Sequence, residues 1–195
     1  MLWIYVIGQI NPATERKVGN YVNNGSIISV DDLQIIADMI TESGKCIGLR
    51  YFNVFGPRQD PNGAYAAVIP RWFSALAKGE RPVIFGDGQT SRDFCYIENV
   101  VAANILAALT EDERAFKEAF NIACGERTTL NELFRAIREL APGAGTVEPI
   151  YEDFRPGDIA HSLASIEKAE SLLGYEPVVK DREGLKRAAR WYLKK

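Results

Sequence analysis

The chain has 195 residues, 47% of them hydrophobic, which suffices for one domain, or for one domain and part of another. Its 23 basic residues nearly balance its 26 acidic ones, so composition favours neither nucleic acid nor an anionic membrane as a partner. Three widely spaced cysteines and a single histidine, His161, argue against a zinc site and a disulfide framework. We therefore expect reduced thiols, no bound metal and a cytoplasmic location.

The first 44 residues carry the weakest signals. The apolar run MLWIYVIG is too short for a membrane span or a signal peptide, so we expect a strand there. Apolar residues at i, i+3, i+4 and i+7 (Leu33, Ile36, Ala37 and Ile40) predict a helix that ends at Gly44.

Residues 46–55, CIGLRYFNVF, are rich in strand formers, and Gly56-Pro57 follows them. They predict one buried strand with the polar Asn53 near its carboxyl end. Ligands of open α/β sheets lie outside the carboxyl ends of the strands, which makes Asn53 a site candidate. The alternative is an asparagine that satisfies backbone groups at a turn.

A helix with Pro70 in its first turn is predicted next, and it ends at Gly79. Residues 83–85 then predict a strand, followed by a Gly-Asp-Gly turn and by Arg92. Arg92 either presents its donor fork to an anion or lies in solvent beside a hairpin. The following helix, to about Leu109, has an apolar stripe, which we expect to be buried (Val101, Ile105, Ala108 and Leu109).

Residues 120–124 predict another buried strand. Thr129 and Glu132 have capping-box spacing at the start of a helix that ends before residues 141–143, and Ser165 is expected to cap the next helix. Between these helices a strand ends near residue 151, and the turn after it carries Arg155 and Asp158. These two side chains either form a surface ion pair or bind a ligand, Arg155 as a second guanidinium and Asp158 as a carboxylate. An amphipathic helix ends the chain.

Four motifs, in this order, resemble the extended short-chain dehydrogenases/reductases of the NAD-dependent epimerase/dehydratase family, which act on nucleotide sugars: LRYFNVFG from Leu49, GDGxxxRDFxYIxNV from Gly86, FNIAxGxxTxLxEL from Phe120 and FRPGDxxHS from Phe154. Within that family, QDPNGAYAAVIPRW is most similar to bacterial UDP-N-acetylglucosamine 4-epimerases of polysaccharide synthesis. The resemblance implies an α/β chain with an incomplete NAD(P)-binding Rossmann-type fold, mainly the C-terminal part with its small α/β substrate-binding subdomain. Residues 1–44 are then a divergent N-terminal segment, and residues 45–195 the nucleotide-sugar-binding half.

The resemblance also implies a UDP-sugar site. Asn53 and Gln59 are expected to hold the sugar or its phosphate. The backbone around Ala67 and Val68 is expected to meet the diphosphate and nucleotide, with Trp72 packed nearby.

The later motifs supply the rest of the expected site. Ile84 and Phe85 flank the uracil, Arg92 and Arg155 clamp the pyrophosphate, and Asp158 accepts hydrogen bonds from the ribose hydroxyls.

Ser162 matches a position where a bulky side chain restricts the pocket in some family members. A serine leaves room for an N-acetyl group, so we lean towards acetylated hexoses: UDP-GlcNAc and UDP-GalNAc rather than UDP-Glc and UDP-Gal.

The family's epimerases bind NAD, remove a hydride from C4 with a tyrosine as base, and return it to the other face. This chain has no GxxGxxG turn and no YxxxK pair, so we expect no catalytic residue in it and no NAD bound by it alone. Tyr51 and Phe52 would touch a nicotinamide only if another chain, a complementing Rossmann half, supplied the cofactor.

The predicted function is therefore the UDP-sugar-binding part of an NAD-dependent nucleotide-sugar 4-epimerase, inactive by itself. Two alternatives stay open: a non-catalytic UDP-sugar-binding module, and a fragment of a related dehydratase or decarboxylase. The sequence leaves the oligomeric state open.

Overall fold

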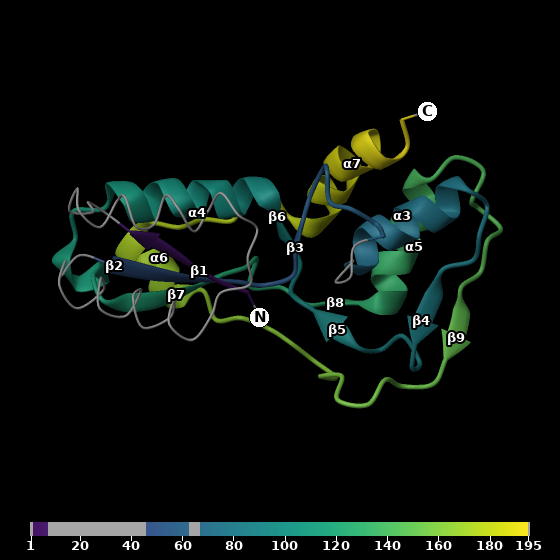
Figure 1. Ribbon diagram of the computed structural model, residues 1–195, viewed down its shortest axis with the longest axis horizontal. Coiled ribbons are helices and arrows are strands. Elements are labelled where there is room, and N and C mark those ends of the chain that lie inside the picture. Colours follow the sequence, from purple (N-terminus) through teal and green to yellow (C-terminus); the bar gives the residue numbers. More distant parts are fainter. Residues whose placement is uncertain (1, 8–45, 63–66, 195) are drawn as a thin grey trace.

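The computed structural model describes residues 2–7, 46–62 and 67–194. These residues form an α/β structure with two packed groups of elements, side by side in Figure 1. One group is a three-stranded sheet with two helices, and the other is a bundle of three helices with short strand pairs. Each group encloses its own cluster of buried apolar side chains.

The sheet has the order β1-β2-β7. β2 (Cys46–Tyr51) is antiparallel to β1 (Leu2–Ile7) and parallel to β7 (Glu118–Ile122). Helix α4 (Ile97–Leu109) lies along the sheet, and the 3-10 turn η1 (Glu113–Ala115) leads from it into β7 (Figure 1). α6 (Glu167–Leu173) packs against β7. Two parallel strands with a helix in the connection between them are the arrangement that the predicted Rossmann-type class requires.

The second group contains the helices α3 (Val68–Ala77), α5 (Leu130–Leu140) and α7 (Asp181–Tyr192). Three short strand pairs accompany them: β3 (Val54–Phe55) with β6 (Cys95–Tyr96), β4 (Val83–Phe85) with β9 (Ile150–Glu152), and β5 (Ser91–Arg92) with β8 (Thr128–Thr129). Large side chains from all three helices form one buried cluster, among them Trp72, Phe73, Phe134 and Leu185. This cluster supports the floor of the site described below.

Several local predictions are confirmed. α3 has Pro70 in its first turn, and Gly79 follows its end with a left-handed φ of 73°. The capping box of α5 is present: Glu132 N donates to Thr129 Oγ1 (3.2 Å), and Thr129 N donates to a Glu132 carboxylate oxygen (2.9 Å). The strand predicted at the start of the chain is β1. The helix predicted before Gly44 lies outside the described residues.

The strand predicted over residues 46–55 is two strands. β2 ends at Tyr51 and pairs with β7, whereas β3 begins at Val54 and pairs with β6. Asn53 lies at the break with a φ of 35°, a conformation that asparagine adopts more readily than most residues. The prediction failed because the two halves of the run have different partners, which local composition does not encode.

The Gly-Asp-Gly turn does not close a hairpin, so that alternative for Arg92 is wrong. β4 before the turn pairs with β9, and β5 after it pairs with β8. The turn packs on the start of α5 instead: Asn131 N donates to Gly88 O (3.0 Å), and a Cβ on Gly88 would lie 2.1 Å from Asn131 Oδ1. The φ of 74° at Gly88 therefore favours a glycine, and any larger residue would also have to displace the Asn131 side chain.

The apolar stripe predicted to bury α4 is on the wrong face. Val101, Ile105 and Leu109 are 50%, 53% and 74% exposed, and the sheet is covered by Val100 and the small residues Ala103 and Ala107. Because α4 is apolar nearly all round, spacing alone does not select its inner face.

The expected cap by Ser165 is also wrong, because α6 begins after Ile166 without a side-chain cap.

Within the described ranges, no helix combines the length and apolar character needed to cross a membrane.

Candidate functional site

A pocket of about 450 Å³ opens at the second group of elements, in the size range of small-molecule sites. Its walls come from the break before β3, from α3, from β4, from β5 and the residues flanking it, and from the segment that follows β9. No single element builds it. The pocket therefore depends on the tertiary arrangement of segments that are far apart in the chain.

Eight of the eleven residues predicted to contact substrate line this pocket: Asn53, Ala67, Val68, Trp72, Phe85, Arg92, Arg155 and Asp158. Seven of them lie in the quoted motifs, and Phe85 directly precedes the motif that starts at Gly86. The motif that starts at Phe120 supplies none of them. Gln59, Ile84 and Ser162 do not line it.

The two predicted anion-binding arginines reach the same pocket in different ways. Arg92 is half-buried, and its Nη1 donates to Ser91 O (2.9 Å) and, less closely, to Ala160 O (3.4 Å). Arg155 is exposed and stacks on Phe85, with its Cζ 3.6 Å from the ring centroid. Two guanidinium groups at one pocket create a positively charged wall suited to an anion with several oxygens.

Asp158 lies on the same exposed segment as Arg155, and its backbone N donates to Arg155 O (3.2 Å). Their side chains form no ion pair, as judged over the described part of the chain, so the ion-pair alternative is wrong. Both charged groups are therefore available to a ligand.

Asn53 and Trp72 are tied to the backbone of the walls. Asn53 Nδ2 donates to Asp93 O (2.9 Å), so this side chain satisfies a backbone group and also lines the pocket. Trp72 is 4% exposed, and its Nε1 donates to Val83 O (3.2 Å). That bond joins α3 to β4 and fixes the indole as a rigid part of the wall.

The three predicted residues outside the pocket have other surroundings. Gln59 Nε2 donates to Val54 O (3.2 Å), while its Oε1 is buried without a hydrogen-bond partner among the described residues. Ile84 is fully buried in the core. Ser162 is half-buried, and its N donates to Ser91 O (3.1 Å).

Sequence reasoning missed basic residues on the α3 side of the pocket. Arg71, Ser74, Ala75 and Lys78 line it and fall at i, i+3, i+4 and i+7, so helical spacing could have found them. Arg81 also lines the pocket, but its Nε and Nη2 donate to Glu148 O and Pro149 O, both at 2.9 Å. Arg81 therefore has a structural role that joins β4 to the chain before β9.

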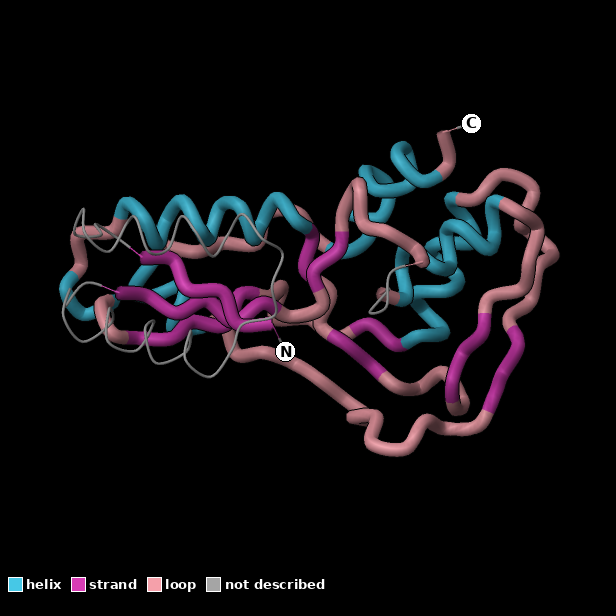
Figure 2. Tube along the Cα trace, in the orientation of Figure 1, coloured by secondary structure: helices cyan, strands magenta, loops and turns pink. Residues whose placement is uncertain are grey.

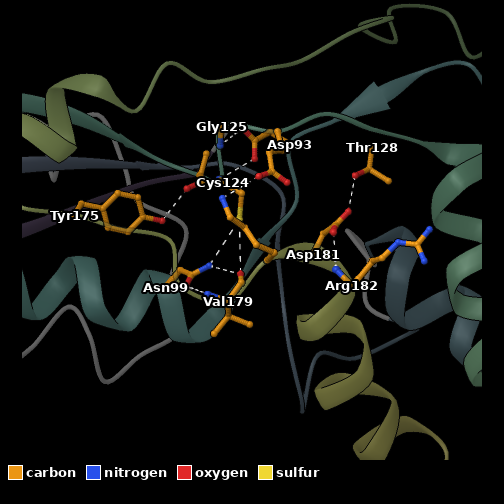
Figure 3. Close-up of polar contacts among 12 residues, drawn as sticks. Asp93, Asn99, Cys124, Gly125, Thr128, Tyr175, Val179, Asp181 and Arg182 are labelled. Carbon is orange, nitrogen blue, oxygen red and sulfur yellow. Dashed lines mark hydrogen bonds and ion pairs between the residues drawn. The ribbon is translucent and has the colours of Figure 1, made fainter.

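Asp93, between two pocket residues, was also missed. Figure 3 shows its carboxylate beside Cys124 and Gly125, whose backbone N–H groups donate to it (2.9 and 3.0 Å), and Ala164 N adds a longer bond (3.4 Å). Burial raises the pKa of this fully buried carboxyl, and the three backbone donors offset that rise in part. Asp93 thereby connects β5, the end of β7 and the segment before α6.

The residues expected to meet a nicotinamide lie away from the pocket. Tyr51 Oη donates to Asn104 Oδ1 (3.0 Å), and neither Tyr51 nor Phe52 lines the pocket. Burial raises the pKa of Tyr51. Neither residue is therefore part of the pocket that the two arginines line. In the described ranges, no cluster of three or more histidine, cysteine or acidic side chains could hold a metal ion.

Known proteins are similar to this chain in sequence and in fold. Residues 33–123 match the NAD dependent epimerase/dehydratase family. A protein of Methanocaldococcus jannaschii, provisionally named as a UDP-glucose 4-epimerase, is 41% identical over 182 residues, which are 93% of this chain and 54% of that protein.

Two solved structures are similar as well. A UDP-N-acetylglucosamine 4-epimerase of Methanobrevibacter ruminantium, in complex with UDP-N-acetylmuramic acid, is 44% identical with a TM-score of 0.68, over 75% of this chain and 45% of that one. A UDP-glucose 4-epimerase of Thermus thermophilus, in complex with NAD, is 29% identical with a TM-score of 0.68, over 83% of this chain and 51% of that one.

The chain spans about half the length of the relatives that it matches. The solved structures among them have Rossmann-type folds, and this chain is similar to part of each. The NAD-dependent epimerase/dehydratase family is therefore the family that this chain resembles in both sequence and fold.

Proposed function

We propose that this chain binds the UDP part of a nucleotide sugar, as the substrate-binding part of an NAD-dependent nucleotide-sugar 4-epimerase. The observation that supports this most directly is that Arg92 and Arg155, from two separate motifs, line one pocket together with Trp72 and Phe85. A diphosphate carries enough oxygens for two bidentate guanidinium contacts. Phe85 stacks with the planar guanidinium of Arg155. Its aromatic ring is also of the kind on which a planar base stacks.

In this proposal, the role of this half is to hold the nucleotide. An epimerase that moves a hydride to the opposite face of a sugar needs a firm hold on the nucleotide and a looser one on the hexose. In the proposed site the charged groups would hold the nucleotide, and the amide of Asn53 would contact the hexose. The preference for an N-acetylated hexose, from Ser162, stays a prediction.

We further propose that this chain by itself does not hold NAD. The sequence has neither a glycine-rich turn nor a YxxxK pair, and the Tyr51 hydroxyl is engaged by Asn104. A complementing Rossmann half would supply the hydride chemistry, and the residues of this chain would bind and orient the nucleotide.

A non-catalytic UDP-sugar-binding module is the second candidate. The sequence supports it, because it has neither the glycine-rich turn nor the YxxxK pair that the hydride chemistry requires. The two candidates predict the same binding and differ only in whether a complementing half restores epimerase activity.

Thermal shift and calorimetry with UDP and with NAD, each alone, test the proposal. We expect UDP to raise the melting temperature, because a ligand stabilises the folded state that binds it, and NAD to have no effect. Arg92→Ala or Arg155→Ala should weaken UDP binding about tenfold or more, the loss of one charge-assisted contact. Arg190→Ala, which removes an exposed arginine outside the pocket lining, is the matched control and should leave the affinity for UDP unchanged.

Three results would contradict the proposal: no response to millimolar UDP, a stabilisation by NAD alone, or equal losses of UDP affinity in Arg190→Ala and the two pocket variants.

A further inference from the structure

The segment between β9 and α6 carries Arg155 and Asp158, yet it has no helix or strand of its own. It runs along one edge of the molecule as an extended loop, from the helix bundle to the sheet (Figure 2). Residues 150–161 are all exposed. Packing against the core therefore does little to hold the middle of this segment in place.

Arg155 stacks on Phe85 near the start of this segment, and Ser91 of β5 holds its middle through a second set of contacts. Ser91 and His161 form an isolated parallel bridge. Ser91 N donates to Ala160 O (3.0 Å), Ser162 N donates to Ser91 O (3.1 Å), and the side chains close the contact, with Ser91 Oγ 2.9 Å from His161 Nδ1. We call these contacts the Ser91–His161 clasp.

The Ser91–His161 clasp also surrounds Arg92. The two carbonyls that accept from Arg92 Nη1 are those of Ser91 and Ala160, which are the residues that the clasp brings together. Within the described residues, Arg92 Nε and Nη2 have no acceptor. With Nη1 held, three N–H groups on one side of the guanidinium stay free for a ligand.

Ser91 is 3% exposed, and His161 supplies the one hydrogen-bond partner that the described residues offer to its hydroxyl. Loss of the imidazole would leave a buried hydroxyl unpaired, which favours opening of the contact. If the contact opened, Ala160 O would move away from Arg92 Nη1. The guanidinium of Arg92 would then be free to point in another direction.

We propose that His161 is a positioning residue for the diphosphate site: through Ser91 it holds the segment after β9 against β5, aims Arg92 and keeps Arg155 at the pocket. This inference rests on the proposed UDP binding. The role proposed for the single histidine of the chain involves neither metal binding nor proton transfer.

Four variants test the role: His161→Ala, His161→Asn, His161→Gln and Ser91→Ala. An asparagine side chain places a hydrogen-bonding atom at the same number of bonds from Cα as Nδ1, whereas a glutamine places it one bond further, near the position of Nε2. His161→Asn should therefore restore the bond to Ser91, and His161→Gln should not. Ser91→Ala removes the same bond from the other side.

Titrations with UDP and with uridine, followed by NMR, give the main readout. We expect His161→Ala and Ser91→Ala to weaken UDP about tenfold and to leave the affinity for uridine unchanged, because only the diphosphate contacts are misaligned. His161→Asn should bind UDP like the unmodified chain, and His161→Gln like His161→Ala. Equal losses for UDP and uridine, or no difference between the asparagine and alanine variants, would overturn the positioning role.

Hydrogen exchange in the ligand-free protein separates this inference from the proposed function. The N–H groups of Ser91 and Ser162 should exchange faster in His161→Ala than in His161→Asn, since both belong to the clasp. Exchange that His161→Ala leaves unchanged would overturn the clasp even where UDP binds. Absence of UDP binding by the unmodified chain, together with faster exchange in His161→Ala, would instead overturn the proposed function and leave the clasp standing.

Discussion

At the scale of single residues, the direction of three consecutive side chains defines one wall of the pocket. Arg92 and Phe94 both line it, while Asp93 between them points away and is fully buried. Successive side chains of an extended chain point to opposite sides, so the bonds that hold Asp93 inward also hold its two neighbours outward. A buried carboxylate that contacts no ligand thereby decides where Arg92 is presented.

Asp93→Asn should destabilise the protein by about 1–3 kcal/mol, because its amide group would face a backbone donor and leave a buried N–H unpaired. Urea denaturation measures the free energy of unfolding. Asp87→Asn is the matched control: Asp87 is exposed and accepts one hydrogen bond from Gln89 N (2.9 Å), which an asparagine also accepts. That control should stay within ~0.5 kcal/mol of the unmodified protein. Similar stabilities for both variants would show that Asp93 does not act as a structural acceptor.

At the scale of elements, α4 packs on the sheet through its smaller residues. Ala103 is fully buried and Ala107 nearly so, whereas the larger Val101 and Ile105 on the other side are half exposed. Asn99 fixes this orientation: it is fully buried, its Nδ2 donates to Val179 O (2.7 Å), and Val179 N donates to its Oδ1 (3.1 Å), as Figure 3 shows. A buried amide must keep its hydrogen bonds, so one polar residue outweighs the apolar stripe on the opposite face.

The orientation of α4 predicts opposite outcomes for two substitutions on the same helix. Ala103→Leu should lower the free energy of unfolding by about 1–3 kcal/mol, because three added carbons do not fit between the helix and the sheet. Ile105→Gln should change it by less than ~0.5 kcal/mol, since Ile105 is 53% exposed. Both values come from urea denaturation. A larger loss for Ile105→Gln than for Ala103→Leu would mean that the stripe predicted from the sequence is the buried one.

At the scale of the whole molecule, the last helix holds the strands that lead into the site. Gly184 of α7 lies so close to β3 and β6 that a Cβ there would be 2.8 Å from Phe55 Cζ and 2.9 Å from Tyr96 Cβ. Further along α7, Tyr192 Oη donates to Gly56 O (2.8 Å). The C-terminal helix and the chain beside Asn53 are therefore one packed unit, although Tyr192 and Gly56 are 136 residues apart in the sequence.

Gly184→Ala tests this packing, because helix propensity and sterics predict opposite signs. Alanine is favoured over glycine in a helix by about 1 kcal/mol. We expect a net loss of about 1–3 kcal/mol, since the Phe55 and Tyr96 atoms near the new methyl group belong to the buried cluster. Gly145→Ala is the control: a Cβ there meets nothing within 4 Å, so stability should be unchanged. A gain in stability for Gly184→Ala would show that α7 is free to shift.

The sequence by itself determined the features whose contacts are local, together with the family. The capping box at Thr129 and Glu132, the start of α3 near Pro70 and the left-handed Gly79 after its end all involve residues within one or two turns. The family resemblance also predicted eight residues that line one pocket, seven of them within the quoted motifs. The boundary at residues 44 and 45, the cytoplasmic location and the roles of the individual site residues stay predictions.

Only the tertiary structure decided what depends on a distant partner. The break at Asn53, the pairing of β4 with β9 and the inner face of α4 each follow from segments that lie far away in the chain. The same holds for the Ser91–His161 clasp, whose two residues have no periodic relation in the sequence. Hydrophobic spacing predicts that a residue packs against other apolar residues. The element against which it packs is determined by the hydrogen bonds of buried polar groups and by steric fit.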